Sequence, residues 1–182
     1  HLSALVFTES DNEGETPRDW PPIAGKGDQQ SLYNALEEGI LSAVVSAHKP
    51  RTNADVAAAK AQRQYCAGSP TLAHFLPSLH SEGVAKWRLS LAALSNVACA
   101  DPAKLAGLYP RKGSLQIGSD ADIVILDPGI ECKVAQSESY AANTVPNPFE
   151  SLKLTGSICD VYVRKSYAAN TVPNPFESLK LT

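Results

Sequence analysis

Residues 105–128, LAGLYPRKGSLQIGSDADIVILDP, decide the predicted fold. Gly107 can end a preceding helix, because glycine readily adopts the left-handed conformation found at helix C-termini. Residues 110–113 have turn composition, and the alternation of apolar and polar side chains at 114–117 predicts a short strand. The β-branched run at 123–126 is too short for a core helix, so we expect a strand buried on both faces.

The flanking sequence alternates predicted helices with predicted strands. Asp28 is a good N-cap for a helix that reaches Glu38, and the apolar run 40–46 follows it as a buried strand. A helix followed by a strand at this spacing is typical of an α/β unit. Asp127–Gly129 should end the strand at 123–126. The other expected elements are strands at 2–8, 131–135 and 158–165, and helices capped by Asn53, Thr71, Ser90 and Asp101.

Composition and charge narrow the function classes. The chain has 182 residues and a net charge of −3, so it is long enough for a domain with a core and has no basic character for nucleic acid. No apolar run is long enough to span a membrane. The four cysteines form no C-x-x-C pair, which favours free thiols in a cytoplasmic protein. The chain opens at His1 and contains no methionine, so we expect a partial chain.

Few side chains are candidates for chemistry. His48 follows the strand predicted at 40–46, where barrel enzymes place catalytic groups, so it can contact a ligand or cap loop backbone. His74 and His80 are six residues apart, whereas two metal ligands on one helix face are three or four apart.

Two carboxylates, Asp120 and Asp122, suggest an acid–base pair. Their place in a turn that leads into a strand favours solvated turn residues instead.

Three phrases carry a resemblance to a known family: SEGV at 81–84, GLYPRKG at 107–113 and GSDADIVI at 118–125. The sequence resembles the C-terminal end of the cyclic-amide amidohydrolases, namely dihydropyrimidinase and hydantoinase. Allantoinase and dihydroorotase are related enzymes. The resemblance implies an α/β fold. Residues 1–112 would form the C-terminal part of a metal-dependent hydrolase TIM-type barrel, and residues 113–165 strands of a small β-sandwich.

The same resemblance bears on the active site. The family binds two zinc ions through a His-x-His pair, a carboxylated lysine, two further histidines and an Asp that also activates the bridging water. Ala47 stands where that Asp is found. A methyl group can neither hold a divalent cation nor accept a proton. We therefore expect no catalytic residue, metal ligand or cofactor in this chain.

Substrate contacts are the remaining role that the resemblance implies. His48 and the loop glycine Gly68 are the candidate substrate-binding residues. At the mouth of the family's site, Trp20 and Ala24 replace a serine and an arginine, so two further polar groups are missing.

Residues 139–155 recur without a change at 166–182. Two identical copies indicate a recent duplication or a gene-assembly artefact, because a functional array shows several diverged copies. We expect the second copy to be disordered or artefactual.

Three functions follow from these observations. The chain is part of a hydrolase that opens the ring of a small cyclic amide, or a non-catalytic relative that acts as a structural or binding partner, or a fragment without a function of its own. The resemblance implies a homo-oligomer, and neither nucleic acid nor membrane is an expected partner. The 182-residue chain by itself is predicted to be inactive.

Overall fold

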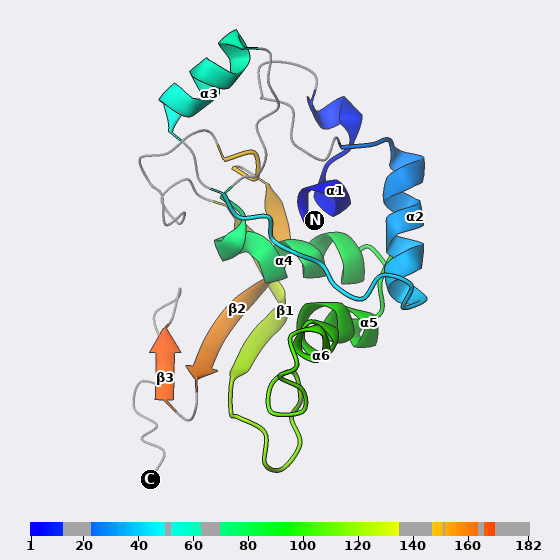
Figure 1. The fold of residues 1–182 in the computed structure, drawn as a ribbon, viewed down its shortest axis with the longest axis vertical. Coiled ribbons are helices and arrows are strands. Elements are labelled where there is room, and N and C mark those ends of the chain that lie inside the picture. The colour runs from blue at the N-terminus through cyan, green and yellow to red at the C-terminus, as the bar shows by residue number, and fades with distance from the viewer. Residues whose placement is uncertain are drawn as a thin grey trace.

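The structure is a computed structural model in which helices gather beside a small antiparallel sheet (Figure 1). It describes residues 1–12, 23–49, 52–62, 70–134, 147–150, 152–163 and 166–169. The helical elements are α1 (Ser3–Val6), η1 (Glu9–Asn12), α2 (Lys26–Glu37), α3 (Asn53–Ala61), η2 (Leu72–His74), α4 (Phe75–Leu79), η3 (His80–Val84), α5 (Leu91–Ser95), η4 (Asn96–Ala100) and α6 (Asp101–Leu105). The strands are β1 (Ile123–Lys133), β2 (Lys153–Val163) and β3 (Ser166–Ala169), in the order β1-β2-β3.

The N-terminal segment is helical, so the strand predicted at 2–8 is wrong. Leu2 and Leu5 are both buried, and their spacing of three residues suits one face of a helix better than one face of a strand. The next helix, α2, begins at Lys26 with Gly25 as its N-cap, two residues before the predicted cap at Asp28. Its predicted end at Glu38 is confirmed to within one residue.

The apolar run 40–46 is not a strand. Two backbone–backbone bonds link it to other described segments: Val45 O accepts from Leu2 N at 2.9 Å, and Val44 N donates to Val97 O at 3.2 Å. Val44 is buried, but Ile40, Leu41 and Val45 are exposed, so the run is not buried as a whole. A strand also needs a neighbour, and no described strand runs beside this segment to form a ladder.

The helices from η2 to α6 follow one another with few breaks, through π-helical turns at η3 and η4. Ser90 caps α5 as predicted, since its Oγ accepts from Ala93 N at 3.1 Å. α6 begins at Asp101 as predicted, but Asp101 is not its N-cap, because η4 runs directly into α6 and Ala100 already has helical geometry. In α3 the cap is Thr52 rather than Asn53: Thr52 and Asp55 exchange hydrogen bonds as a capping box.

The sheet differs from the prediction in length and burial. β1 runs to Lys133, so Asp127–Gly129 does not end it; the register shifts between Asp127 and Glu131 instead, and a bulge on an edge strand tolerates a proline. Val124 is 47% exposed, so the strand is not buried on both faces. The strand predicted at 158–165 is confirmed as the end of β2.

A loop replaces the strand predicted at 114–117, and Leu115 is exposed there. Two features hold this loop. A Cβ on Gly113 would lie 2.6 Å from Cys99 O, so the backbone packs directly on η4. Lys112 Nζ forms ion pairs with Asp120, at 2.7 Å, and with Asp122.

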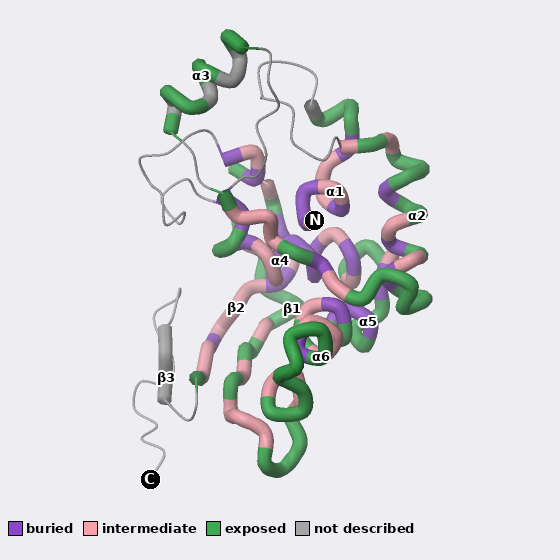
Figure 2. Tube along the Cα trace, viewed as in Figure 1, coloured by how far each residue is buried: buried purple, intermediate pink, exposed green. Residues whose placement is uncertain are grey.

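The core is one cluster that lies where the helices meet the sheet, and the buried residues gather there in Figure 2. It includes members from both sides of the predicted boundary at 112/113, such as Leu94 and Leu154. Cys99, Cys132 and Cys159 form no disulfide, in line with the prediction, and Cys66 lies outside the described residues. Of the predicted disordered or artefactual segment 166–182, the described part is β3, which pairs with β2. Among the described helices, none combines the length and apolar character needed to cross a membrane.

Candidate functional site

The turn Ser46–His48 is held in place by the next described segment. Thr71 is fully buried, and its Oγ1 donates to Ser46 O at 2.7 Å. The backbone N of Leu72 donates to His48 Nδ1 at 3.1 Å. The structure therefore fixes both ends of the turn, although the predicted strand before it is absent.

The two ring nitrogens of His48 have different roles: Nδ1 is used in a contact within the chain, and Nε2 is available to a ligand. Because its Nδ1 accepts the Leu72 N–H, the proton of the neutral imidazole lies on Nε2. The residue is partly exposed. His48 can therefore donate a hydrogen bond from Nε2 to an acceptor that reaches this turn.

Ala47 lies between Ser46 and His48, the two residues that Thr71 and Leu72 hold, and its φ of +52° is in the left-handed region. Non-glycine residues are uncommon there, and Asn and Asp are the most frequent of them. The backbone therefore has the conformation that suits an Asp, while the side chain is a methyl group that offers no ligand atom.

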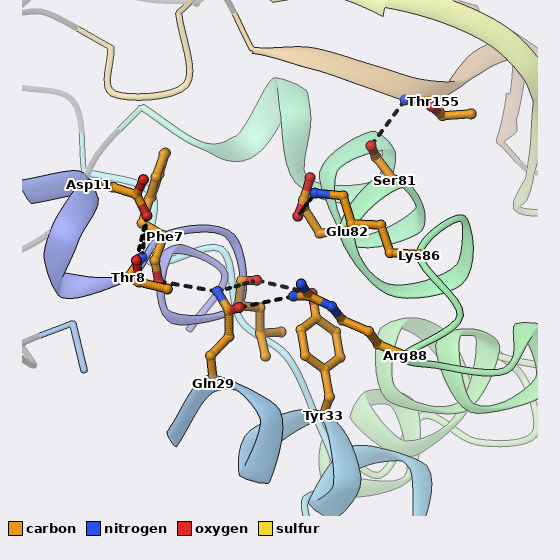
Figure 3. Close-up of polar contacts among 11 residues, drawn as sticks. Phe7, Thr8, Asp11, Gln29, Tyr33, Ser81, Glu82, Lys86, Arg88 and Thr155 are labelled. Carbon is orange, nitrogen blue, oxygen red and sulfur yellow. Dashed lines mark hydrogen bonds and ion pairs between the residues drawn. The ribbon is translucent and has the colours of Figure 1, made fainter. Parts of the chain in front are cut away.

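His74 and His80 are held in contacts with distant segments. His74 is buried, and its Nε2 lies 3.3 Å from Asn147 Nδ2. His80 Nδ1 lies 2.7 Å from the carbonyl oxygen of Thr155, and a Cβ on Gly156 would overlap the same ring. Ser81 Oγ accepts from Thr155 N at 3.1 Å, which completes the joint between η3 and β2 (Figure 3).

The remaining candidates divide into described and undescribed residues. Asp120 and Asp122 share Lys112 in the turn before β1, and the hydrogen bond from Lys112 holds the pKa of Asp120 below its usual range. These ion pairs support the interpretation of Asp120 and Asp122 as turn residues rather than as an acid–base pair. Ala24 is exposed and its carbonyl accepts from Glu9 N at 3.0 Å. Gly68 and Trp20 lie outside the described residues.

A two-zinc site does not fit the described side chains. Within them, no group of three or more His, Cys, Asp or Glu residues is arranged to hold a metal ion. The side chains at the turn point to the same conclusion. Ala47 has no atom that can bind a metal ion, and Nδ1 of His48 accepts a hydrogen bond from a backbone N–H. We therefore assign no metal-dependent step to these residues.

A buried polar cluster on α2 was not predicted from the sequence (Figure 3). Gln29 Nε2 donates to Leu5 O at 3.1 Å and to Phe7 O at 3.3 Å, and its Oε1 accepts from Arg88 Nη1 at 2.9 Å. Tyr33 OH also donates to Leu5 O, at 3.0 Å. The cluster fixes the N-terminal segment onto α2. The only signal in the sequence was the spacing of Gln29 and Tyr33, one helical turn apart.

Burial and charge shape the acid–base behaviour of this cluster. Burial raises the pKa of Tyr33 above its usual range, the charge of Glu82 adds to the effect, and Arg88 opposes it. The Arg88 guanidinium lies 5.3 Å from the centre of the Tyr33 ring, a cation–π distance. Tyr33 therefore stays protonated and acts as a structural donor.

A short turn beside this cluster carries an ionised carboxylate. Asp11 Oδ2 accepts from Thr8 N at 2.7 Å and from Thr8 Oγ1 at 2.8 Å. These two hydrogen bonds lower the pKa of Asp11.

Comparison with known proteins assigns the family. Residues 25–164 match the Amidohydrolase family. The chain belongs to the amidohydrolase family. The resemblance inferred from SEGV, GLYPRKG and GSDADIVI is thereby confirmed.

Within the amidohydrolases, similar proteins are hydantoinases. The chain is 37% identical to L-hydantoinase of Paenarthrobacter aurescens over 75% of its own length and 30% of the relative. It is 35% identical to D-hydantoinase of Geobacillus stearothermophilus, over 75% of this chain and 29% of that one.

The fold agrees with this assignment. The structure of L-hydantoinase (dihydropyrimidinase) from Arthrobacter aurescens superposes with a TM-score of 0.85 at 32% identity, and the match covers 95% of this chain and 39% of that one. The amidohydrolase fold is therefore established for a chain that spans about 30% of the length of the curated relatives it matches.

Proposed function

We propose that this chain contributes part of the substrate-binding mouth of a cyclic-amide amidohydrolase and that, as a 182-residue chain, it does not hydrolyse substrate. The observation that carries the proposal is Ala47. The turn keeps a backbone conformation suited to Asp but lacks the carboxylate that would hold a cation and accept a proton. Family membership supports descent from an amidohydrolase, whereas the methyl side chain of Ala47 argues against catalytic turnover by this chain.

Residues 1–112 are proposed to form the C-terminal part of a TIM-type barrel, and residues 113–165 to provide strands of a β-sandwich. In such a barrel, groups that bind substrate gather at the C-terminal ends of the strands. The segment 40–46 would be one of those strands, and no strand among the described residues runs beside it to form a ladder.

The proposed substrate class is the small cyclic amides, hydantoins and dihydropyrimidines, which matches the names of the relatives. Hydrolysis would add water across a ring C–N bond, so the ring carbonyl gains negative charge on its oxygen. His48 Nε2–H is the group in this chain that we assign to such an oxygen. Gly68 is proposed as a second contact, through its backbone.

Activity and metal content test the proposal together. We expect purified chain, supplied with zinc, to retain no stoichiometric metal and to open neither hydantoin nor dihydrouracil. Ala47→Asp should not restore turnover, because one carboxylate supplies a single ligand of the family's set. L-hydantoinase of Paenarthrobacter aurescens provides the positive control. Two bound zinc ions per chain with measurable turnover would overturn the proposal.

A non-catalytic binding role is the second candidate, and the loss of functional groups at both Ala47 and Ala24 favours it. In that case hydantoin should raise the melting temperature of the wild-type chain, since a ligand that binds the native state stabilises it. The shift should be lost in His48→Phe and kept in His74→Phe, in which the substituted position lies in the contact with Asn147. An equal shift in both variants would exclude His48 as the contact.

A further inference from the structure

Thr71 places a fully buried hydroxyl at the N-cap position of η2. Threonine is mostly exposed in folded proteins, and a buried hydroxyl costs free energy unless it is hydrogen-bonded. Here the hydroxyl donates to Ser46 O at 2.7 Å, across 25 residues of the sequence. The bond therefore ties the start of η2 to the turn Ser46–His48, which carries the candidate ligand contact.

Two further hydrogen bonds complete this contact. Leu72, the residue after Thr71, donates its backbone N–H to His48 Nδ1 at 3.1 Å. Within the turn, His48 N donates to Ser46 Oγ at 3.3 Å. Because Thr71 and Leu72 are joined by one peptide bond, a loss of the contact with Ser46 also moves the donor that binds the His48 ring.

Of the two segments in this contact, η2 is the fixed one. Thr71 O accepts from His74 N at 3.1 Å, and the buried His74 ring lies against Asn147. The turn is the segment that is held, since Ala47 has φ +52° and strained positions persist only where the surrounding structure imposes them. The bonds on either side of Ala47 supply that constraint.

We propose that Thr71 is a positioning residue for ligand recognition, which holds His48 as a hydrogen-bond donor through Ser46 and Leu72. A neutral imidazole has one donor nitrogen and one acceptor nitrogen. The Leu72 N–H occupies the acceptor, so the Nε2 donor is left for a ligand. The identity of the ligand as a cyclic amide rests on the proposed function, whereas the positioning role rests on the hydrogen bonds alone.

This arrangement selects the orientation of a ligand. The ring of a cyclic amide presents carbonyl oxygens, which accept hydrogen bonds, and N–H groups, which donate them. Nε2 of His48 pairs with a carbonyl oxygen, whereas a ring N–H in the same place would oppose two donors and leave both without a partner. Thr71 thereby makes the turn specific for the carbonyl edge of the ring without contacting the ligand itself.

Nuclear magnetic resonance of the ligand-free chain tests the positioning role. Thr71→Val removes the hydroxyl at nearly constant size, and Thr71→Ser keeps it. At about pH 8, where an ordinary imidazole is neutral, the His48 Nδ1 resonance should show an accepted hydrogen bond in the wild type and in Thr71→Ser but not in Thr71→Val. The Leu72 amide should exchange with solvent about tenfold faster in Thr71→Val, as expected for the loss of one hydrogen bond. The signal that disappears in His48→Phe identifies His48 among the four histidines.

Ser81→Ala is the matched control. Ser81 is also buried, and its hydroxyl also joins a distant segment, since it accepts from Thr155 N at 3.1 Å. This variant should lower the stability of the fold and leave the His48 resonance and the Leu72 exchange rate unchanged. Equal changes in Ser81→Ala and Thr71→Val, or an unchanged resonance in Thr71→Val, would overturn the proposal. If Thr71→Val does not fold, Thr71→Ser decides: a retained hydrogen bond at Nδ1 supports the role of the hydroxyl, and its loss contradicts it.

Titration with hydantoin measures the consequence for binding. Thr71→Val should bind hydantoin about tenfold more weakly than the wild type, and Thr71→Ser should stay close to the wild type. Equal affinities of the wild type and Thr71→Val would overturn the positioning role and leave the proposed function intact. Failure of the wild type to bind hydantoin would instead contradict the proposed function, and the ligand-free spectra would still decide the role of Thr71.

Discussion

His48 and His80 are both held through Nδ1 by the backbone of a distant segment, but the two contacts have opposite polarity. His80 Nδ1 faces a carbonyl oxygen and therefore carries the proton, and the ring is buried against Gly156. His48 Nδ1 accepts an N–H, and its residue is partly exposed. The comparison shows that the first histidine serves as a joint between η3 and β2, while the second keeps a donor available for a ligand.

The largest expected effect lies at the His80 joint. Gly156 has φ +108°, and a Cβ there would overlap the His80 ring. Gly156→Ala should therefore combine backbone strain with overpacking and destabilise the chain by about 3 kcal/mol, measured by urea denaturation.

Gly107→Ala is the matched control for that variant. Gly107 also has a left-handed backbone, at φ +67°, but nothing lies within 4 Å of its added Cβ. The expected cost is backbone strain alone, about 1 kcal/mol. Equal losses in the two variants would show that the contact with His80 does not determine the glycine.

Replacing the two histidines tests the comparison directly. His80→Ala should cost about 2–3 kcal/mol, because it leaves Thr155 O without its partner and opens a cavity under β2. His48→Ala should cost about 0.5–1 kcal/mol, since the Leu72 N–H that it exposes can be solvated. Thermal melts of both variants measure the difference. A cost for His48→Ala that matches that of His80→Ala would make His48 a structural residue.

Ala47→Gly should stabilise the chain, by about 0.5–1 kcal/mol. Glycine removes the strain of the left-handed backbone, and the greater entropy of the unfolded chain offsets part of the gain. Ala47→Val should destabilise, because a β-branched side chain is least tolerant of this conformation. Urea midpoints measure both. A loss of stability in Ala47→Gly would mean that the turn does not impose its conformation on residue 47.

Acid titration of Asp11 should give the smallest effect, against which changes at the two histidines can be judged. Its pKa is lowered in the folded chain, so the ionised carboxylate stabilises the fold above its unfolded pKa, near 4. That contribution is lost as the pH falls through the folded pKa. Asp11→Asn should be less stable than wild type at pH 7 by about 0.3 kcal/mol, as expected for an exposed group. The gap should close in acid, and a gap independent of pH would contradict this origin.

Local chemistry was read correctly at some positions, although the helix caps predicted at Asp28 and Asn53 were wrong. Ser90 caps its helix as predicted, because an N-cap bond reaches only three residues along the chain. The strand at 123–126 was found from its β-branched composition, and the strand predicted at 158–165 is the end of β2. The family followed from short phrases in turns, whose residue types are set by local backbone needs.

The errors arose where tertiary contacts decide the outcome. The run 40–46 has the composition of a strand but no described neighbour to pair with. The helix at α1 places Leu2 and Leu5 in the core, a result that a seven-residue apolar segment does not reveal. At the candidate site, Ala47 was identified from the resemblance, whereas the bonds from Thr71 and Leu72 join segments about 25 residues apart and carry no sequence signature.

β3 has a consequence for how the edge of β2 is occupied. Its sequence, SYAA, occurs unchanged at 139–142, so one chain contains two identical candidates for the same set of backbone hydrogen bonds. Only the connection distinguishes them: two residues separate β3 from the end of β2, and ten separate 142 from its start. A two-residue connection is a usual β-hairpin loop, which favours the copy at 166–169 as the partner of β2. The duplication thus makes strand exchange within one chain a competition that loop length, rather than side-chain identity, resolves.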